Sequence, residues 1–180
     1  MRSLFTAALL SVPLAGWMTS TGEPVPIDPG GFAFELSTVV PADPVDAFDA
    51  FTGDVSPWWD HHHSETPHAL RIEPRPGGHF LELFDDEGNG AVHATVNFAK
   101  RGEELQFLGP LGFAGGGTNL QMAHRIRFVA EGDGTRVTVS VRGIGEVQEG
   151  WPQVVENVWN HFLVDRYARF VSGTLDGTGR

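Results

Sequence analysis

The chain has 180 residues, enough for one domain with its own core, and its 41% hydrophobic and 19% charged composition is typical of a folded globular protein. Its formal net charge of -11 opposes binding to nucleic acid or to an anionic membrane surface. The sequence contains no cysteine, which excludes disulfides, thiolate nucleophiles and cysteine-ligated metals.

The N-terminus has the pattern of a signal peptide. One positive charge at Arg2 precedes an apolar run over residues 4–18, and small residues suited to a peptidase follow up to Gly22. The run is too short to span a bilayer comfortably. We therefore predict a signal peptide over 1–22, a mature N-terminus between Gly16 and Glu23, and a periplasmic or secreted protein. The alternative is a cytoplasmic protein, since one arginine is a thin basic region and Pro13 interrupts the run.

The first half of the domain reads as strands with one short helix, after a proline-rich linker over 23–31. Apolar and polar residues alternate from Phe32, which predicts a half-buried strand. Asp43 as N-cap and Pro44 at the first helical position predict a short helix that ends near Gly53. Turn residues then separate four predicted short strands, at Ala69–Glu73, Phe80–Phe84, Ala91–Ala99 and Glu104–Leu108.

The second half predicts a loop, two longer strands and a long helix. Residues 111–118 are rich in glycine and should form a mobile loop. Apolar residues alternate in 122–128 and again in 137–141, with a turn between the two strands. Residues 148–171 repeat apolar side chains at helical spacing, and residues 174–180 read as a flexible tail.

This order of elements predicts an α+β domain over residues 32–173. About seven antiparallel strands would form one sheet whose apolar face must be covered, and the long C-terminal helix is the element able to cover it. The sheet should therefore wrap around that helix and leave an interior cavity near the short helix and the loops.

Several short motifs support this architecture. They are the passage over residues 41–51, the pair Trp58-Trp59, the run Arg75-Pro76-Gly77-Gly78-His79-Phe80, the turn Gly134-Thr135-Arg136-Val137, and the helix entry Gly150-Trp151. With them, residues 32–172 resemble the helix-grip fold of the START and birch-pollen-allergen superfamily, often labelled SRPBCC. The chain looks most like the branch named after the activator of a heat-shock-protein ATPase. The resemblance implies the fold, and much less about function, because the superfamily mixes carriers, cyclases, hydrolases and co-chaperones.

Polar residues on the predicted inner face are candidates for a binding site. Strand parity points Glu82 and His124 inward, where a carboxyl and an imidazole would have perturbed protonation and could do acid–base work. The alternatives are two buried polar groups satisfied by hydrogen bonds, or a Glu82 that faces outward because Leu81 and Leu83 take the core. His93 lies out of phase with Ala94, so we expect its side chain outside. The predicted ligand-binding residues are Trp58, Trp59, Phe80, Glu82, Met122, His124 and Trp159.

The run His61-His62-His63, with Asp60, Glu65 and His68 nearby, also suggests a metal site. Consecutive residues in an extended chain rarely point at one ion, so at most two of the three imidazoles could share it. We interpret the run as a polar surface loop and assign no metal and no cofactor.

Three functions are compatible with these features. The first is an exported protein that binds a small hydrophobic or amphipathic molecule in its cavity. The second is a cyclase- or hydrolase-type enzyme that uses Glu82 and His124, although the sequence has no nucleophile elbow and no phosphate-binding loop. The third is a co-chaperone-like interaction module, which conflicts with a signal peptide. We expect a binding protein with no catalytic residue assigned.

Overall fold

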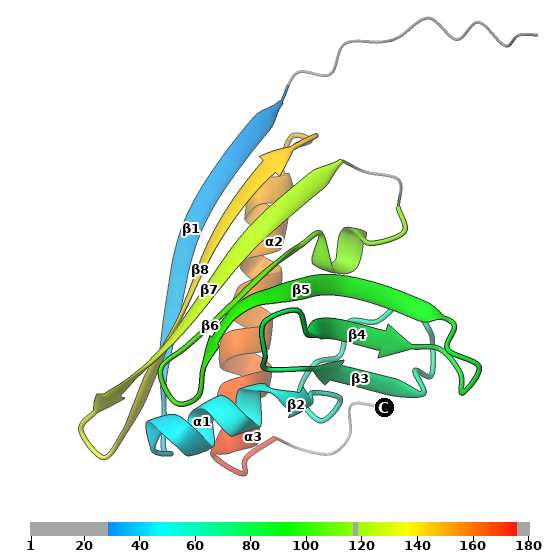
Figure 1. Ribbon diagram of the computed structural model, residues 1–180. Coiled ribbons are helices and arrows are strands. Elements are labelled where there is room, and N and C mark those ends of the chain that lie inside the picture. The colour runs from blue at the N-terminus through cyan, green and yellow to red at the C-terminus, as the bar shows by residue number, and fades with distance from the viewer. Residues whose placement is uncertain (1–28, 117–118, 176–180) are drawn as a thin grey trace, which may run out of the picture.

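A computed structural model describes residues 29–116 and 119–175 of the chain (Figure 1). The predicted signal peptide, most of the predicted linker and most of the predicted tail lie outside these residues. Within them, no helix has both the length and the apolar character needed to cross a bilayer.

The architecture is one antiparallel sheet of eight strands in the order β1-β8-β7-β6-β5-β4-β3-β2. The predicted antiparallel sheet is confirmed, and the strand beyond the expected seven is the short β2 beside β3. The strands are β1 (Gly30–Val40), β2 (Gly53–Asp54), β3 (Ala69–Ile72), β4 (His79–Leu83), β5 (Gly90–Lys100), β6 (Glu104–Gly109), β7 (Leu120–Glu131) and β8 (Gly134–Gly145).

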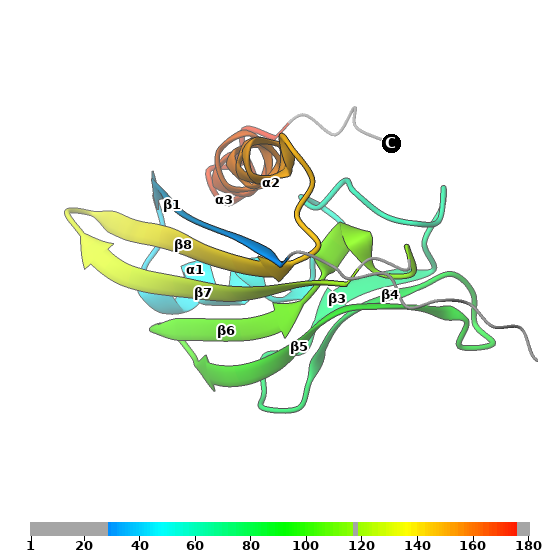
Figure 2. The same ribbon diagram turned by 90° about the horizontal axis from the view of Figure 1, so that it is seen from above.

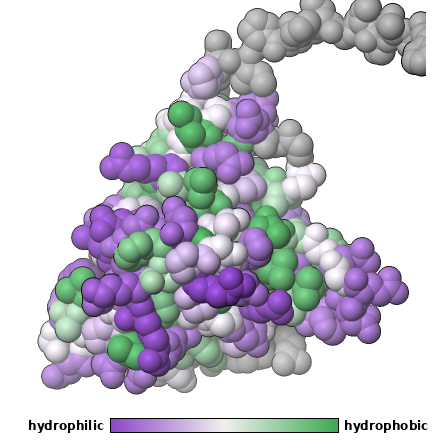
Figure 3. Space-filling view, viewed as in Figure 1, coloured by the Kyte–Doolittle hydropathy of each residue, from purple (hydrophilic) through white to green (hydrophobic). Residues whose placement is uncertain are grey.

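The predicted C-terminal helix is also confirmed, with one irregularity. It consists of α2 (Trp151–Asn160), a π-helical segment η2 (His161–Ala168) and α3 (Arg169–Val171). Seen from above, this rod lies on one side of the curved sheet (Figure 2). The opposite side of the sheet shows mostly hydrophilic side chains with separate hydrophobic spots (Figure 3). A sheet with one apolar face that is covered by a single long helix is the helix-grip arrangement.

Two short helical segments close the ends of the sheet. The helix α1 (Pro44–Phe51) begins as predicted, since the Asp43 carboxylate accepts hydrogen bonds from the backbone amides of Val45 and Asp46 at 2.9 and 3.0 Å. The 3-10 turn η1 (Leu111–Phe113) begins the segment that we expected to be a mobile loop. Residues 117–118 of that segment lie outside the described residues.

The end of the domain near α1 is filled by aromatic side chains. Phe51 contacts Trp58, Phe128 and Tyr167, with ring centroids 5.1 to 5.9 Å apart. The Trp58 indole donates a hydrogen bond to the carbonyl of Ala50 at 3.1 Å. The Tyr167 hydroxyl donates to the Ala47 carbonyl at 2.6 Å, and burial raises the pKa of this phenol. Each buried polar tip therefore has a partner, as a solid core requires.

The expectation that His93 lies outside is wrong, because β5 contains a bulge. Leu81 of β4 pairs with Val92 and the preceding Phe80 pairs with Ala94, so His93 is an extra residue in the ladder. A bulge allows two consecutive side chains to face the same side of a sheet. His93 and Ala94 are both buried, with exposed fractions of 2% and 1%.

Candidate functional site

A cavity of about 250 Å³ lies between the sheet, the last helix, the loop over residues 60–68, called here the histidine loop, and η1. The helix contributes Val154, Val155, Val158, Trp159 and Phe162 to its wall. Apolar side chains from other elements are Trp59, Leu111, Phe113 and Met122, and the imidazoles on the wall are His61, His62, His63 and His93. The cavity is slightly smaller than the roughly 300–1,000 Å³ usual for drug-sized ligands, so it suits a compact molecule.

The residues predicted to bind a ligand divide into two groups. Trp59, Met122 and Trp159 line the cavity, and the indole of Trp59 stacks on Phe162 with centroids 3.7 Å apart. The others are buried beside cavity-lining residues without forming part of the wall; they are Trp58, Phe80, Glu82 and His124.

Glu82 faces inward as expected and is fully buried. Its carboxylate accepts hydrogen bonds from the backbone amides of His63 at 2.9 Å and Ser64 at 2.8 Å. Its second oxygen lies 2.9 Å from Nε2 of His93. Burial alone would raise the pKa of Glu82, but the hydrogen bonds from Ser64, His63 and His93 outweigh it and lower the pKa. The histidine loop is thus anchored to β4 by a buried carboxylate.

Both ring nitrogens of His93 face oxygen atoms. Nε2 faces Glu82, and Nδ1 lies 3.2 Å from the carbonyl oxygen of Leu111. Leu111 has a φ of 49°, a left-handed conformation that costs a residue with a side chain roughly 1–3 kcal/mol. The ring of His93 is fixed by the bulge in β5, by the carbonyl of Leu111 and by the carboxylate of Glu82. In this arrangement both nitrogens of His93 are engaged by oxygen atoms of the protein.

His124 is buried, with an exposed fraction of 2%, but it does not meet Glu82. Its ring stacks on Phe107, with centroids 4.7 Å apart, and contacts Trp159 at 5.3 Å. Neither nitrogen has a hydrogen-bond partner among the described residues. Burial lowers its pKa to about 3, and the nearby backbone of Phe107 and Met122 offsets only part of this effect. His124 is therefore a neutral ring held among aromatic side chains.

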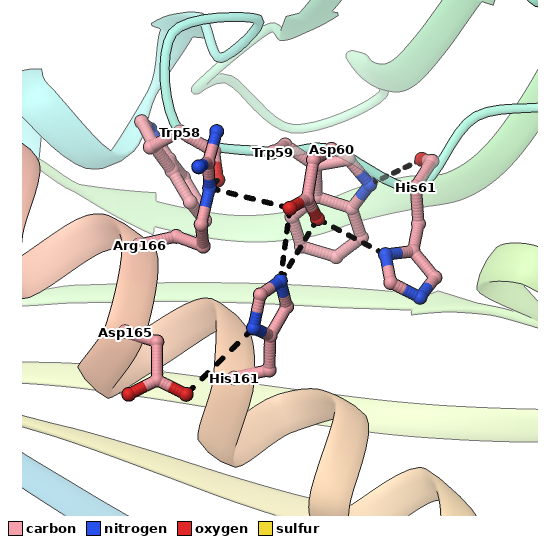
Figure 4. Close-up of polar contacts among 7 residues, drawn as sticks. All are labelled: Trp58, Trp59, Asp60, His61, His161, Asp165 and Arg166. Carbon is pink, nitrogen blue, oxygen red and sulfur yellow. Dashed lines mark hydrogen bonds and ion pairs between the residues drawn. The ribbon is translucent and has the colours of Figure 1, made fainter. Parts of the chain in front are cut away.

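A second polar cluster ties the histidine loop to the last helix (Figure 4). The Asp60 carboxylate lies 2.9 Å from Nε2 of His161, 3.0 Å from Nδ1 of His61 and 3.3 Å from Nε of Arg166. Burial would raise the pKa of Asp60, but the hydrogen bonds from His161 and His61 and the charges of His161 and Arg166 lower it. The Trp59 indole donates to the His61 carbonyl at 2.7 Å and holds the same segment.

Sequence reasoning missed the central pair of this site, Glu82 with His93. Strand parity assigned Glu82 correctly, but a bulge has no reliable signature in a single sequence, so His93 was assigned to the wrong face. The histidine run itself gave a usable signal. Two of its members contact acidic groups in separate clusters, His61 through its ring and His63 through its backbone.

Comparison with solved structures supports the same fold. Protein CV1439 from Chromobacterium violaceum is 17% identical with a TM-score of 0.57, over 80% of this chain and 98% of that one. A protein from Rhizobium leguminosarum is 13% identical with a TM-score of 0.60, over 81% and 97% of the two chains. The protein Ara h 8.0201 is 13% identical with a TM-score of 0.55, over 80% of this chain and 99% of that one.

No protein-family model matches the sequence, and no curated protein is similar to it at a significant level. The structural likenesses are all at low identity, so they show the helix-grip fold of the birch-pollen-allergen type and nothing finer. The resemblance to the branch named after the heat-shock ATPase activator is not confirmed by these structures.

Proposed function

We propose that this protein is exported and binds a small hydrophobic or amphipathic molecule in its cavity. The observation that supports the proposal most is the composition of the wall, which is apolar on the helix side and carries imidazoles on the other. Apolar walls stabilise a ligand by removing its surface from water, and a few polar groups orient it.

The shape of the cavity indicates the class of ligand. A volume of about 250 Å³ fits a molecule of roughly one or two rings or a short chain. The body of the ligand would lie against Val158, Trp159 and Phe162, and its single polar group would face the histidine loop. A hydrogen bond made there counts for more than one made in water, because the surroundings are apolar.

Native mass spectrometry of the mature, untagged chain tests this proposal. We expect a bound small molecule that is lost on denaturation, or saturable binding of an apolar fluorescent probe such as anilinonaphthalene sulfonate. Val158→Trp should fill the cavity and weaken probe binding at least roughly tenfold. Val164→Trp, on the same helix but not on the cavity wall, is the matched control. Equal probe binding by both variants would overturn the proposal.

The enzyme alternative, with Glu82 and His124 as the acid–base pair, gains little from the geometry. Glu82 is engaged by two backbone amides and His93, and no hydrogen bond or ion pair among the described residues joins it to His124. The co-chaperone alternative rests only on the sequence resemblance. Binding is therefore the function that we put forward.

Export rests on the sequence of residues 1–22 alone. N-terminal sequencing of protein made in its native host tests it, with an expected start between Gly16 and Glu23. An intact Met1 would argue for a cytoplasmic protein.

A further inference from the structure

We propose that His63, Glu82 and His93 bind a divalent transition metal ion, with Zn²⁺ as the best match, at the wall of the cavity. The proposal does not depend on ligand carriage, because metal binding is measured separately, although His63 and His93 also line the cavity. The three residues come from the histidine loop, from β4 and from the bulge of β5.

The ligand atoms are already close to one another. One atom from each of the three side chains can be chosen so that all lie within 4.8 Å. In a tetrahedral zinc site with bonds of about 2.0–2.1 Å, ligand atoms lie roughly 3.3 Å apart. His93 Nε2 and Glu82 Oε2 are 2.9 Å apart, so they need to separate only slightly. The ring of His63 is exposed, makes no hydrogen bond among the described residues, and can rotate towards the other two.

The geometry between the ring of His93 and Glu82 leaves a place for a proton or a metal ion. If Nδ1 donates its proton to the Leu111 carbonyl, the lone pair of a neutral Nε2 points at a carboxylate oxygen 2.9 Å away. Two electron-rich atoms at that distance repel each other unless a proton or a metal ion lies between them.

The partners of the two inner ligands match those of metal sites. A ligating histidine usually donates its other N–H to a carbonyl or a carboxylate, and a ligating carboxylate is itself hydrogen-bonded. Leu111 supplies such a carbonyl to His93, and the amides of His63 and Ser64 supply the hydrogen bonds to Glu82. The rings of His63 and His93 are stacked, with centroids 5.1 Å apart and planes 4° from parallel, so the exposed ring of His63 has to turn before its lone pair reaches the ion.

The donor set favours zinc over the hard cations. Two imidazoles and one carboxylate suit Zn²⁺ and its neighbours, whereas Ca²⁺ and Mg²⁺ take oxygen ligands. Three protein ligands leave a coordination position open. Because His63 and His93 both line the cavity, that position faces the cavity.

The second cluster, Asp60 with His61 and His161, is a weaker site although its atoms are equally close. The Arg166 guanidinium lies 3.3 Å from the Asp60 carboxylate and already neutralises it. By contrast, no lysine or arginine of the described residues lies within ion-pair distance of Glu82. We therefore expect changes in the first cluster to weaken Zn²⁺ binding and changes in the second to leave it unaltered, so each cluster is a control for the other.

Isothermal titration of the untagged, chelator-treated full chain with Zn²⁺ is the test, with Co²⁺ absorption as a second readout. We expect one ion per chain and visible bands of four-coordinate Co²⁺. His63→Asn and His93→Asn should each weaken Zn²⁺ binding at least roughly tenfold, since the loss of even an outer partner costs that much. His161→Asn and His68→Asn should bind as the unaltered chain does, because neither residue belongs to the site.

Circular dichroism identifies any variant that fails to fold. If the buried change His93→Asn prevents folding, His63→Asn still decides the test, because His63 is exposed. No heat with Zn²⁺ would overturn the proposal and leave His93 as a hydrogen-bond partner of Glu82. Unchanged binding by His63→Asn, or binding lost in His161→Asn instead, would also overturn it. The ligand proposal is tested separately by the Val158 and Val164 variants.

Discussion

Replacing His124 by Phe should remove a pH dependence of stability from the protein. His124 is buried between Phe107 and Trp159 with both nitrogens unpartnered, and its pKa is lowered from 6.5 to about 3. The folded protein therefore keeps this ring neutral at pH values where the unfolded chain protonates it. The unfolded state binds more protons between these two values, so stability must fall as pH falls from about 6.5 towards 3.

The size of the effect follows from the two pKa values. Each pH unit below the unfolded pKa corresponds to about 1.4 kcal/mol, so between pH 7.5 and pH 5.0 His124 alone should remove about 2 kcal/mol from the free energy of unfolding. A Phe ring keeps the stacking but carries no proton. At pH 7.5 the Phe substitution removes two unpartnered nitrogens, which stabilises the fold, and overpacks the core mildly, which destabilises it. Each effect is roughly 1–3 kcal/mol, so we expect little net change in the free energy of unfolding.

Urea unfolding of both proteins at pH 7.5 and 5.0 measures the difference. The unaltered chain should lose about 2 kcal/mol more than His124→Phe on going to the lower pH. The other histidines are common to both proteins, so their contribution to the pH dependence cancels in the comparison. If the two proteins show the same pH dependence, the ring has a partner that neutralises the effect of burial, and the reasoning fails.

Three further predictions concern the residues around the site. Trp58→Ala should lower the free energy of unfolding by roughly 3–5 kcal/mol, because Trp58 is fully buried, whereas Trp58→Phe should cost less; denaturant titration checks both. Glu82→Gln should cost about 1.5–3 kcal/mol in the same assay through weaker hydrogen bonds from His63 and Ser64, and a neutral result would contradict the anchoring role. The pKa of Asp60 is lowered in the folded protein, so its stabilisation is present above about pH 4 and is lost as pH falls further; Asp60→Asn should flatten the acid limb of a stability–pH curve.

Local patterns were sufficient to predict most of the fold. The alternation from Phe32, the Asp43-Pro44 helix start and the apolar spacing over 148–171 each depend on neighbours in the chain, and the structure has the corresponding elements. The two-residue β2 was missed because so short a segment has no periodicity. The π-helical segment was missed because its spacing differs little from that of an α-helix over a single turn or two.

The site was harder to predict because it depends on where the pattern breaks. A single inserted residue in β5 reverses the face of His93, and this reversal creates the pair with Glu82. The strained Leu111 that completes the pair is equally invisible, since nothing in its identity favours a positive φ. Strand parity assigned Glu82 to the inner face, and the histidine run was a second usable signal, but the partners of that run on β4 and β5 lie far from it in the chain.

The concave side of the sheet is thus divided into a region that stabilises the fold and a region that contains the candidate site. Around Phe51 and Tyr167 the rings contact each other directly and their polar tips are satisfied, so changes there should alter stability. Around Phe162 the packing gives way to a cavity, and the buried charge of Glu82 lies nearby. Trp59 stands at the boundary, because it contacts Trp58 on one side, stacks on Phe162 on the other and fixes the histidine loop through its indole N–H. A conservative change at Trp59 should therefore disturb binding and stability together, whereas changes in either region alone should affect mainly one of them.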